Sequence, residues 1–288
     1  MSSTTGHVKT RYGELAVWES AGQGLPIVMI HGNSANKSVF GHQFADAMAQ
    51  KYRLIAPDLP GHGESENAQD PQQAYTLSGY ADAITDMLDA MGVDRAAMFG
   101  WSLGGHVALE LVERFPGTVG VMVTGTPPVG RSPEEIMAGF QPSPHAGVPF
   151  KADLSEEERG ILAFIACGDP QNKDVHEAIM RTDARAREAV FADMMAGGPA
   201  DERKIAETRD IPLAIVNGEN DPMVNLDYVS SLAYRNLWED HCFLLRGAGH
   251  AAFMQTPDLF NPVFGRFAED MAQRALTMRF GGSRTAVA

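Results

Sequence analysis

The stretch GWSLGG, residues 100–105, decides how the rest of the chain is interpreted. It has the pattern G-x-S-x-G centred on Ser102, follows the apolar run 96–99 and precedes apolar residues at helical spacing. A serine on such a strand-to-helix turn has a strained backbone and needs small neighbours, which Gly100 and Gly104 supply. The turn also lifts the hydroxyl above the edge of a sheet. We interpret Ser102 as a nucleophile; the alternative is a small residue in a glycine-rich helix start.

Short apolar runs alternate with helical periods on both sides of this stretch. Continuous apolar strands between helices are typical of a parallel sheet that is covered on both faces. The sequence therefore predicts an α/β fold. The strand-like runs are residues 26–30, 53–57, 96–99, 119–125, 211–218 and 241–247.

The alternation stops between about Thr126 and Glu207, where no strand-like run occurs and prolines are frequent. We predict a helical cap over residues 127–206, inserted into a core formed by residues 1–126 and 207–288. Proline is excluded from a helix interior, so the last helix is expected to begin at Asn261, with Pro262 in its first turn. The tail from Met278 onward is expected to be loose.

Composition and charge exclude several classes of function. The net charge is −14, from 23 basic and 37 acidic residues, without a cluster of Lys and Arg, which disfavours nucleic acid and anionic membranes as partners. Two cysteines, Cys167 and Cys242, make no disulfide framework and fit a reducing compartment. No secretory h-region and no apolar stretch of roughly 20 residues is present. We expect a soluble cytoplasmic protein.

A nucleophilic serine needs a base, and nine histidines compete for that role. His250 follows the last predicted strand, so its loop lies at the carboxyl edge of the sheet, where the Ser102 turn also lies. His106 stands four residues after Ser102 on the same helix and is expected to be structural. His62, in the segment PGHGES, is expected to stabilise its own turn.

The base needs an acid that orients it. Asp221 lies just beyond the strand 211–218, within reach of a histidine on the neighbouring loop, and Glu219 is its rival. We favour Asp221. The chain order is then Ser, Asp, His, which is the order of α/β-hydrolases.

An oxyanion needs two N–H donors. Leu103 places one at the start of a helix, and the glycine-bearing loop after the strand 26–30 supplies the other at Asn33. His31 in that loop is interpreted as a buried imidazole that braces the turn, which is compatible with an oxyanion role for Asn33.

Other chemistries lack their motifs in this sequence. No two histidines stand at i, i+2 or i, i+4, so a zinc site and any other metal cofactor are not expected. No phosphate-binding G-x-x-x-x-G-K-[ST] motif occurs, and nucleotide binding is not expected. Haloalkane dehalogenases and epoxide hydrolases carry aspartate where this chain has Ser102, so those activities lose support.

Seven segments together resemble the N-acyl-homoserine lactonases of the α/β-hydrolase fold (AidH-type), and the likeness runs from about Ile27 to Phe267. That resemblance implies a mostly parallel eight-stranded sheet flanked by helices, with a helical cap after strand 6 and no cofactor. In that family the acid after the seventh strand is glutamate, where this chain has Asp221. The segments are HGNS (31–34), IAPDLPGHGES (55–65), FGWSLGGH (99–106), TGTPPV (124–129), RTDARAR (181–187), IVNGENDP (215–222) and GAGHAAF (247–253).

The resemblance implies a small-molecule acyl lactone as substrate, opened through an acyl-enzyme, and quenching of bacterial signalling. The candidate substrate-binding residues are Trp101, Asn33, Met137, Phe140, Leu162 and Phe253. Apolar side chains of the cap are candidates for an acyl tunnel, although we expect most of them to be core between helices and sheet. They are Met137, Phe140, Phe150, Leu162, Phe164, Ile165, Met194 and Met195.

Three other functions remain open. The nearest is a general carboxylesterase that acts on small acyl esters with the same triad. Perhydrolase or cofactor-free haloperoxidase activity uses the same serine with peroxide. A receptor of this fold that binds a lactone and signals through its cap belongs to another class. The sequence also leaves monomer and dimer open.

Overall fold

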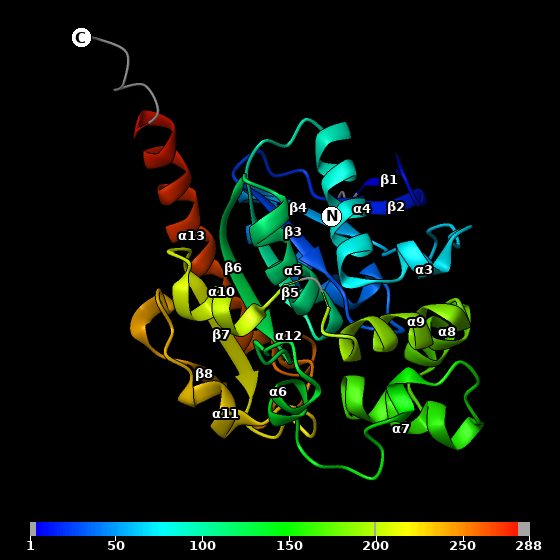
Figure 1. Ribbon diagram of the computed structural model, residues 1–288. Coiled ribbons are helices and arrows are strands. Elements are labelled where there is room, and N and C mark those ends of the chain that lie inside the picture. The colour runs from blue at the N-terminus through cyan, green and yellow to red at the C-terminus, as the bar shows by residue number, and fades with distance from the viewer. Residues whose placement is uncertain (1–3, 199, 282–288) are drawn as a thin grey trace.

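The computed structural model describes residues 4–198 and 200–281, and an eight-stranded sheet forms its centre (Figure 1). The strand order is β1-β2-β4-β3-β5-β6-β7-β8, with β1 and β2 antiparallel to their neighbours and the other pairs parallel. The predicted mostly parallel eight-stranded sheet is confirmed. The strands are β1 (Thr4–Thr10), β2 (Gly13–Glu19), β3 (Pro26–Ile30), β4 (Arg53–Pro57), β5 (Ala96–Trp101), β6 (Thr118–Thr124), β7 (Leu213–Gly218) and β8 (Phe243–Leu245).

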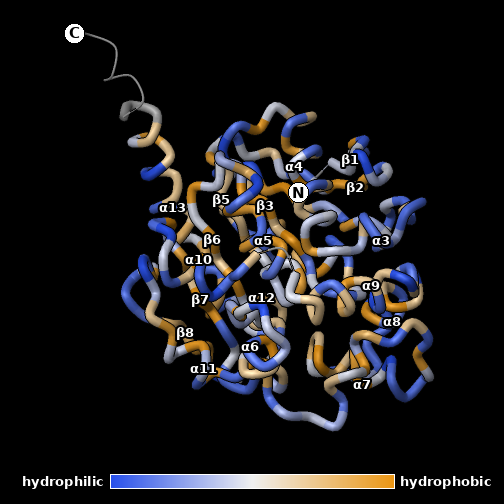
Figure 2. Tube along the Cα trace, in the orientation of Figure 1, coloured by the Kyte–Doolittle hydropathy of each residue, from blue (hydrophilic) through white to orange (hydrophobic). Residues whose placement is uncertain are grey.

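Helices cover both faces of the sheet, and β5, β6 and β7 are buried along their whole length. Helices α4 (Leu77–Ala90) and α5 (Leu103–Arg114) pack on one face, and α13 (Pro257–Gly281) packs on the other (Figure 1). The strands at the centre are among the most hydrophobic parts of the trace (Figure 2). The short helices of the core are η1 (Lys37–Phe40), α1 (Gly41–Ala45), α2 (Met48–Lys51), α3 (Pro71–Ala74), α11 (Leu226–Ser231), η3 (Trp238–Asp240) and α12 (Ala252–Gln255).

A run of helices connects β6 to β7, where the sequence predicts a helical insertion. Helices α7, α8 and α9 lie together at one end of the sheet (Figure 1). Ser132 and Ser155 each begin a helix with a reciprocal capping box, which explains where α6 and α7 start. The predicted end of the cap, residue 206, falls inside α10. The helices are α6 (Pro133–Ala138), η2 (Val148–Phe150), α7 (Glu156–Cys167), α8 (Lys173–Arg181), α9 (Ala184–Met195) and α10 (Glu202–Thr208).

The segment RTDARAR (181–187) connects this helical layer to the core through hydrogen bonds. The hydroxyl of Tyr75 donates to the carboxylate of Asp183 at 2.7 Å, and the backbone N–H of Asp183 donates to the carbonyl of Gly61. The guanidinium of Arg181 donates to the carbonyl of Ser65 at 2.7 Å. Polar contacts from one short segment therefore hold the entry to α9 against the loop after β4.

The last helix differs from its predicted start. It begins at Pro257 and contains Pro262, so the prediction that Asn261 caps it is wrong. Proline in the second turn loses the hydrogen bond to the carbonyl four residues earlier and crowds that carbonyl, while Phe260 and Phe264 on either side of it are fully buried and hold the helix against the sheet. The predicted loose tail is wrong for residues 278–281, which lie in α13; residues 282–288 lie outside the described residues.

None of the helices in residues 4–198 and 200–281 has the length and apolar character needed to cross a membrane.

Candidate active site

Ser102 occupies a strained turn between β5 and α5. Its backbone has φ 53° and ψ −121°, a conformation that non-glycine residues rarely adopt. A Cβ on Gly104 would overlap the carbonyl oxygen of Ile30, and one on Gly100 would overlap that of Gly104. The glycines of the G-x-S-x-G pattern are therefore required for the chain to pass this closely, as the sequence predicts.

His250 and Asp221 form a buried pair. The Nδ1 atom of His250 lies 3.0 and 3.1 Å from the two carboxylate oxygens of Asp221, and its N–H donates to them. The same carboxylate accepts the backbone N–H groups of Met223 and Val224. Burial alone raises the pKa of Asp221, but the interaction with His250 and these hydrogen bonds outweigh it and lower the pKa below its ordinary value. Asp221 is thus ionised. Its carboxylate holds the imidazole of His250 at Nδ1, which leaves Nε2 available to Ser102.

The rival acid lies elsewhere. The Glu219 side chain is exposed, and its carboxylate accepts the backbone N–H of Gly247 at 3.4 Å. Of the two candidate acids, the structure brings only Asp221 to His250.

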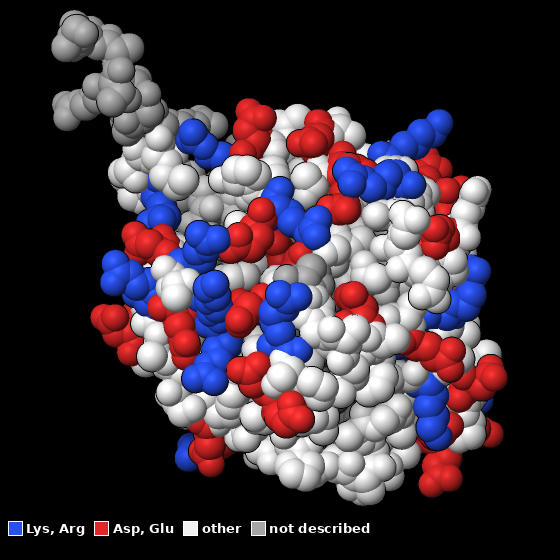
Figure 3. Space-filling view, in the orientation of Figure 1, with Lys and Arg blue, Asp and Glu red and all other residues white. Residues whose placement is uncertain are grey.

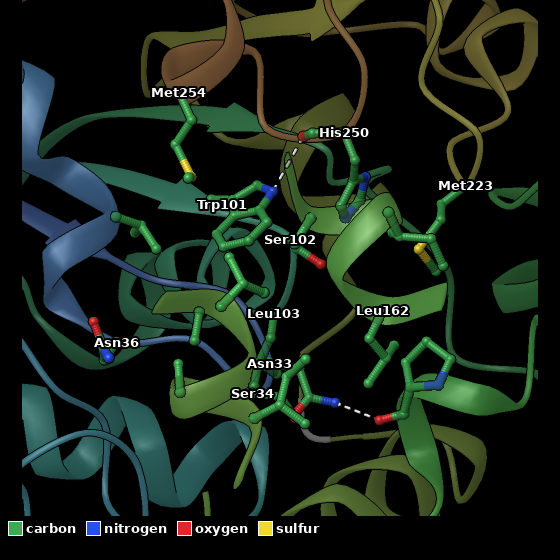
Figure 4. A pocket seen from close by; sticks show the side chains of 18 of the residues that line it. Asn33, Ser34, Asn36, Trp101, Ser102, Leu103, Leu162, Met223, His250 and Met254 are labelled. Atoms are coloured by element: carbon green, nitrogen blue, oxygen red, sulfur yellow. Dashed lines mark hydrogen bonds between the residues drawn. The ribbon is translucent and has the colours of Figure 1, made fainter. Parts of the chain in front are cut away.

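Ser102 and His250 face the same cavity, which Figure 4 shows from close by. Trp101 connects them, because it precedes Ser102 in the chain and its indole N–H donates to the carbonyl oxygen of His250 at 3.1 Å (Figure 4). Its ring centroid also lies 5.9 Å from that of His250. Trp101 therefore lines the cavity and also anchors the loop that carries the imidazole.

The loop after β3 passes directly beside the serine. A Cβ on Gly32 would lie 3.2 Å from the Cβ of Ser102 and 3.0 Å from the Trp101 ring. The backbone N–H groups of Asn33 and Leu103 donate no hydrogen bond to any part of the chain that the structure describes. Both are therefore available as donors beside Ser102, and their role as the oxyanion hole stays a prediction.

His31 braces this loop. Its Nδ1–H donates to the carbonyl of Gly32 at 2.8 Å, and its Nε2 accepts the backbone N–H of Leu59 at 3.0 Å. Burial lowers the pKa of His31, so the ring is neutral and this tautomer is fixed. The buried ammonium of Lys37 holds the next turn through Asp58, at 2.7 Å, an ion pair that no sequence pattern indicated.

Two adjoining cavities lie between the helical layer and Ser102. The inner one has a volume of about 170 Å³ and the outer one about 1020 Å³. Among the described residues that line them there is no lysine or arginine; Asp174 borders the inner cavity, and Glu156 and Glu157 the outer one. The face between α6 and α7 is correspondingly poor in charge (Figure 3). The side chains common to both cavities are Phe140, Phe150, Ile165, Met194 and Met223.

Of the predicted substrate-binding residues, Asn33, Trp101, Phe140 and Leu162 line the inner cavity, and Met137 lines the outer one. The prediction for Phe253 is wrong. This side chain is fully buried among aromatic rings, 5.3 Å from Phe40, 5.6 Å from Phe99 and 5.5 Å from Trp101 between centroids, because α12 turns it toward α13.

The eight apolar cap residues listed above line the cavities instead of packing mainly against the sheet. Each lines one cavity or both, so the prediction that most are helix-to-sheet core is wrong, although Leu162 and Met194 also belong to buried clusters. The sequence pattern could not distinguish the two roles, because apolar spacing on a helix is the same for a core and for a cavity wall. Lining residues that the sequence missed include Ile179, Val190, Met223 and Met254.

The two other histidines near the site are placed as follows. His62 donates from Nδ1 to the carbonyl of Pro60 at 3.0 Å, within its own turn as predicted, and burial with the neighbouring His31 lowers its pKa to about 3. His106 lines the inner cavity and is paired through Nδ1 with the carboxylate of Glu202 at 2.9 Å.

Similar proteins support an enzyme of this fold. The model of the alpha/beta hydrolase family matches residues 27–263. The N-acyl homoserine lactonase AidH, solved in complex with N-butanoyl homoserine, is 40% identical with a TM-score of 0.90, over 94% of this chain and 98% of that chain. A glycine variant of AidH, in complex with N-hexanoyl homoserine lactone, has the same identity and TM-score, over 94% and 99%.

Other relatives are more distant. A pimeloyl-[acyl-carrier protein] methyl ester esterase of Vibrio atlanticus is 27% identical, over 88% of this chain and 97% of its own length. An uncharacterised protein of Mycobacterium tuberculosis is 35% identical over 111 residues, and this match spans only 31% of that protein's length. An esterase from Rhodococcus sp. ECU1013, 22% identical with a TM-score of 0.71 over 94% and 100% of the two chains, shares the fold.

A strained serine turn and a cap-covered cavity thus occur in a chain that matches both lactonases and esterases, and we conclude that this chain belongs to the alpha/beta hydrolase family and hydrolyses ester bonds.

Proposed function

We propose that this chain opens the lactone ring of N-acyl-homoserine lactones, with Ser102, His250 and Asp221 as its catalytic triad. The observation that carries the proposal is the likeness to AidH, which extends over the cap as well as the core: the TM-score is 0.90 over 94% of the chain. The AidH complexes contain an acyl homoserine lactone and the ring-opened N-butanoyl homoserine.

The first half-reaction breaks the ring. The Ser102 hydroxyl attacks the lactone carbonyl while Nε2 of His250 takes its proton, and Asp221 stabilises the imidazolium. The N–H groups of Asn33 and Leu103 hold the negative oxygen, each contributing about 3 to 4 kcal/mol to lowering the barrier. The bond from the carbonyl carbon to the ring oxygen then breaks, and that oxygen takes the proton from His250. The result is an acyl-enzyme that carries a free homoserine hydroxyl.

The second half-reaction releases the product. His250 takes a proton from water, the resulting hydroxide adds to the acyl carbon, and collapse returns the proton to Ser102. The product is an N-acyl-homoserine, so an acyl lactone signal between bacteria is destroyed. Ring opening is favoured over amide cleavage because an alkoxide leaves an ester more readily than an amine leaves an amide.

Mass spectrometry of N-butanoyl and N-dodecanoyl homoserine lactone incubated with the enzyme tests this function. Wild type and Ser230→Ala, a control at an exposed serine on α11, are expected to add one water to each lactone. Ser102→Ala is expected to add none above the buffer rate. Undiminished hydrolysis by Ser102→Ala contradicts the nucleophile, and free homoserine lactone among the products contradicts ring opening.

A second candidate function is that of a carboxylesterase acting on simple acyl esters. The similarity to the Vibrio esterase supports this candidate, because the match spans 97% of the length of that esterase. A panel of p-nitrophenyl esters beside the lactones separates the two functions. A strong preference for the simple esters would support the esterase over the lactonase.

A further inference from the structure

A second imidazole with a carboxylate partner lines the inner cavity, one helical turn beyond Ser102. His106 lies on α5, and its Nδ1 is 2.9 Å from each carboxylate oxygen of Glu202 on α10. Both side chains are buried, and Glu202 also accepts the backbone N–H of Val129 at 3.2 Å. The ring is therefore held in one orientation from two elements.

This pairing fixes which nitrogen carries the proton. A carboxylate only accepts hydrogen bonds, so Nδ1 of His106 carries a proton, and in that tautomer Nε2 carries the lone pair of the ring. Nε2 forms no hydrogen bond with the residues described in the structure. It is not enclosed either, in contrast to Nε2 of His62, which is fully buried without a partner. A hydrogen-bond acceptor at His106 is thus left accessible from the cavity that contains Ser102.

The distance along α5 suits one group of the proposed substrate. In an acyl homoserine lactone, the amide nitrogen is two bonds from the attacked carbonyl carbon, about 2.5 Å away. A hydrogen bond adds about 3 Å. His106 stands four residues after Ser102, about 6 Å along the axis of α5, and both side chains line the inner cavity, so they can contact neighbouring groups of one bound substrate. The Phe140 ring, whose centroid lies 6.3 Å from that of His106, walls the same part of the cavity.

We propose that Nε2 of His106 accepts a hydrogen bond from the amide N–H of the substrate, which makes His106 a positioning residue and selects lactones that carry an acylamino group. This inference rests on the proposed function and deepens it. Simple lactones and esters have no N–H at that position, and they would leave the acceptor without its partner. The Glu202 carboxylate acts through His106, by holding its tautomer and its orientation.

The test compares N-hexanoyl homoserine lactone with its carba analogue, in which CH₂ replaces the amide N–H. The quantity measured is the ratio of kcat/KM for the amide to kcat/KM for the analogue. Asn in place of histidine retains a donor at the position of Nδ1 and has no group at Nε2, so His106→Asn keeps the bond to Glu202. His106→Phe retains the ring volume and loses both nitrogens. Active sites are counted by labelling with a fluorophosphonate, so misfolded enzyme does not enter the rates.

Wild type is expected to prefer the amide by about tenfold, the effect of one hydrogen bond between neutral groups, and both variants are expected to lose that preference. The loss should appear mainly in KM. A preference that persists in His106→Asn overturns the inference and leaves the proposed function standing, because His106 is then only a strut between α5 and α10. If wild type opens neither lactone, the proposed function fails, and this inference fails with it.

Discussion

The indole N–H of Trp101 donates to the carbonyl oxygen of His250, so the residue that precedes the proposed nucleophile holds the backbone of the proposed base. Both groups are buried, and the bond connects positions 149 residues apart in sequence. The relative placement of serine and imidazole therefore depends on an indole nitrogen as well as on the sheet.

Trp101→Phe tests that dependence. The change leaves the His250 carbonyl without its donor, which is expected to cost about 1 to 3 kcal/mol of unfolding free energy. We expect kcat to fall by more than KM rises, because misplacement of the base affects the reaction rather than binding. Urea unfolding and steady-state kinetics on a short acyl lactone measure the two effects. A change in KM alone would assign Trp101 to substrate contact instead.

Ile165 tests the connection between the two cavities. Its side chain borders both, so Ile165→Trp is expected to narrow the passage from the inner to the outer one. Each methylene of an acyl chain that is kept from an apolar surface forfeits about 0.8 kcal/mol. We therefore expect kcat/KM for N-dodecanoyl homoserine lactone to fall at least about tenfold, with a smaller loss for N-butanoyl.

Phe164→Trp is the matched control for this change, because Phe164 borders only the outer cavity and is more than half exposed. Equal losses for both chain lengths in Ile165→Trp would contradict passage of the acyl chain along this route.

The lowered pKa of Asp183 predicts how the stability of the contact between cap and core depends on pH. Burial raises its pKa, but hydrogen bonds from Arg185 and Tyr75 outweigh burial and lower the pKa to about 2. Because the folded pKa lies below the unfolded one, the carboxylate stabilises the fold above about pH 4, and that contribution is lost as pH falls toward 2. Asp183→Asn should therefore unfold at lower urea than wild type at pH 6, and the gap should narrow at pH 3. An equal gap at both pH values would contradict the assignment.

Particular residues show which features of the fold and the site could be predicted from the sequence. Ser102 and its sheet were predictable because the glycine pattern, the buried strands and the helices all follow from local sterics and periodicity. Asp221 could be preferred to Glu219 only by its place after the strand, and the structure agrees because the exposed Glu219 carboxylate binds Gly247 instead. Their catalytic roles remain predictions.

Other features depend on tertiary packing that local sequence does not encode. The place of Phe253 just after His250 in the sequence indicates a contact with substrate, but its side chain packs into the aromatic cluster against α13. Pro262 is tolerated in a helix because its neighbours are buried. Strand β1 has an exposed, polar sequence and carries no periodic signal of its own; it forms through its pairing with β2.

The electrostatics of the two cavities give the proposed reaction a direction. A lactone is neutral when it enters, and its ring-opened form leaves with a carboxylate charge. Neither cavity offers that anion a lysine or arginine among its described lining residues, and Asp174 borders the inner one. In the proposed reaction, the new carboxylate therefore has hydrogen-bond donors beside Ser102 but no cationic partner among these described residues, and we expect it to leave for bulk water rather than to be retained as an ion pair.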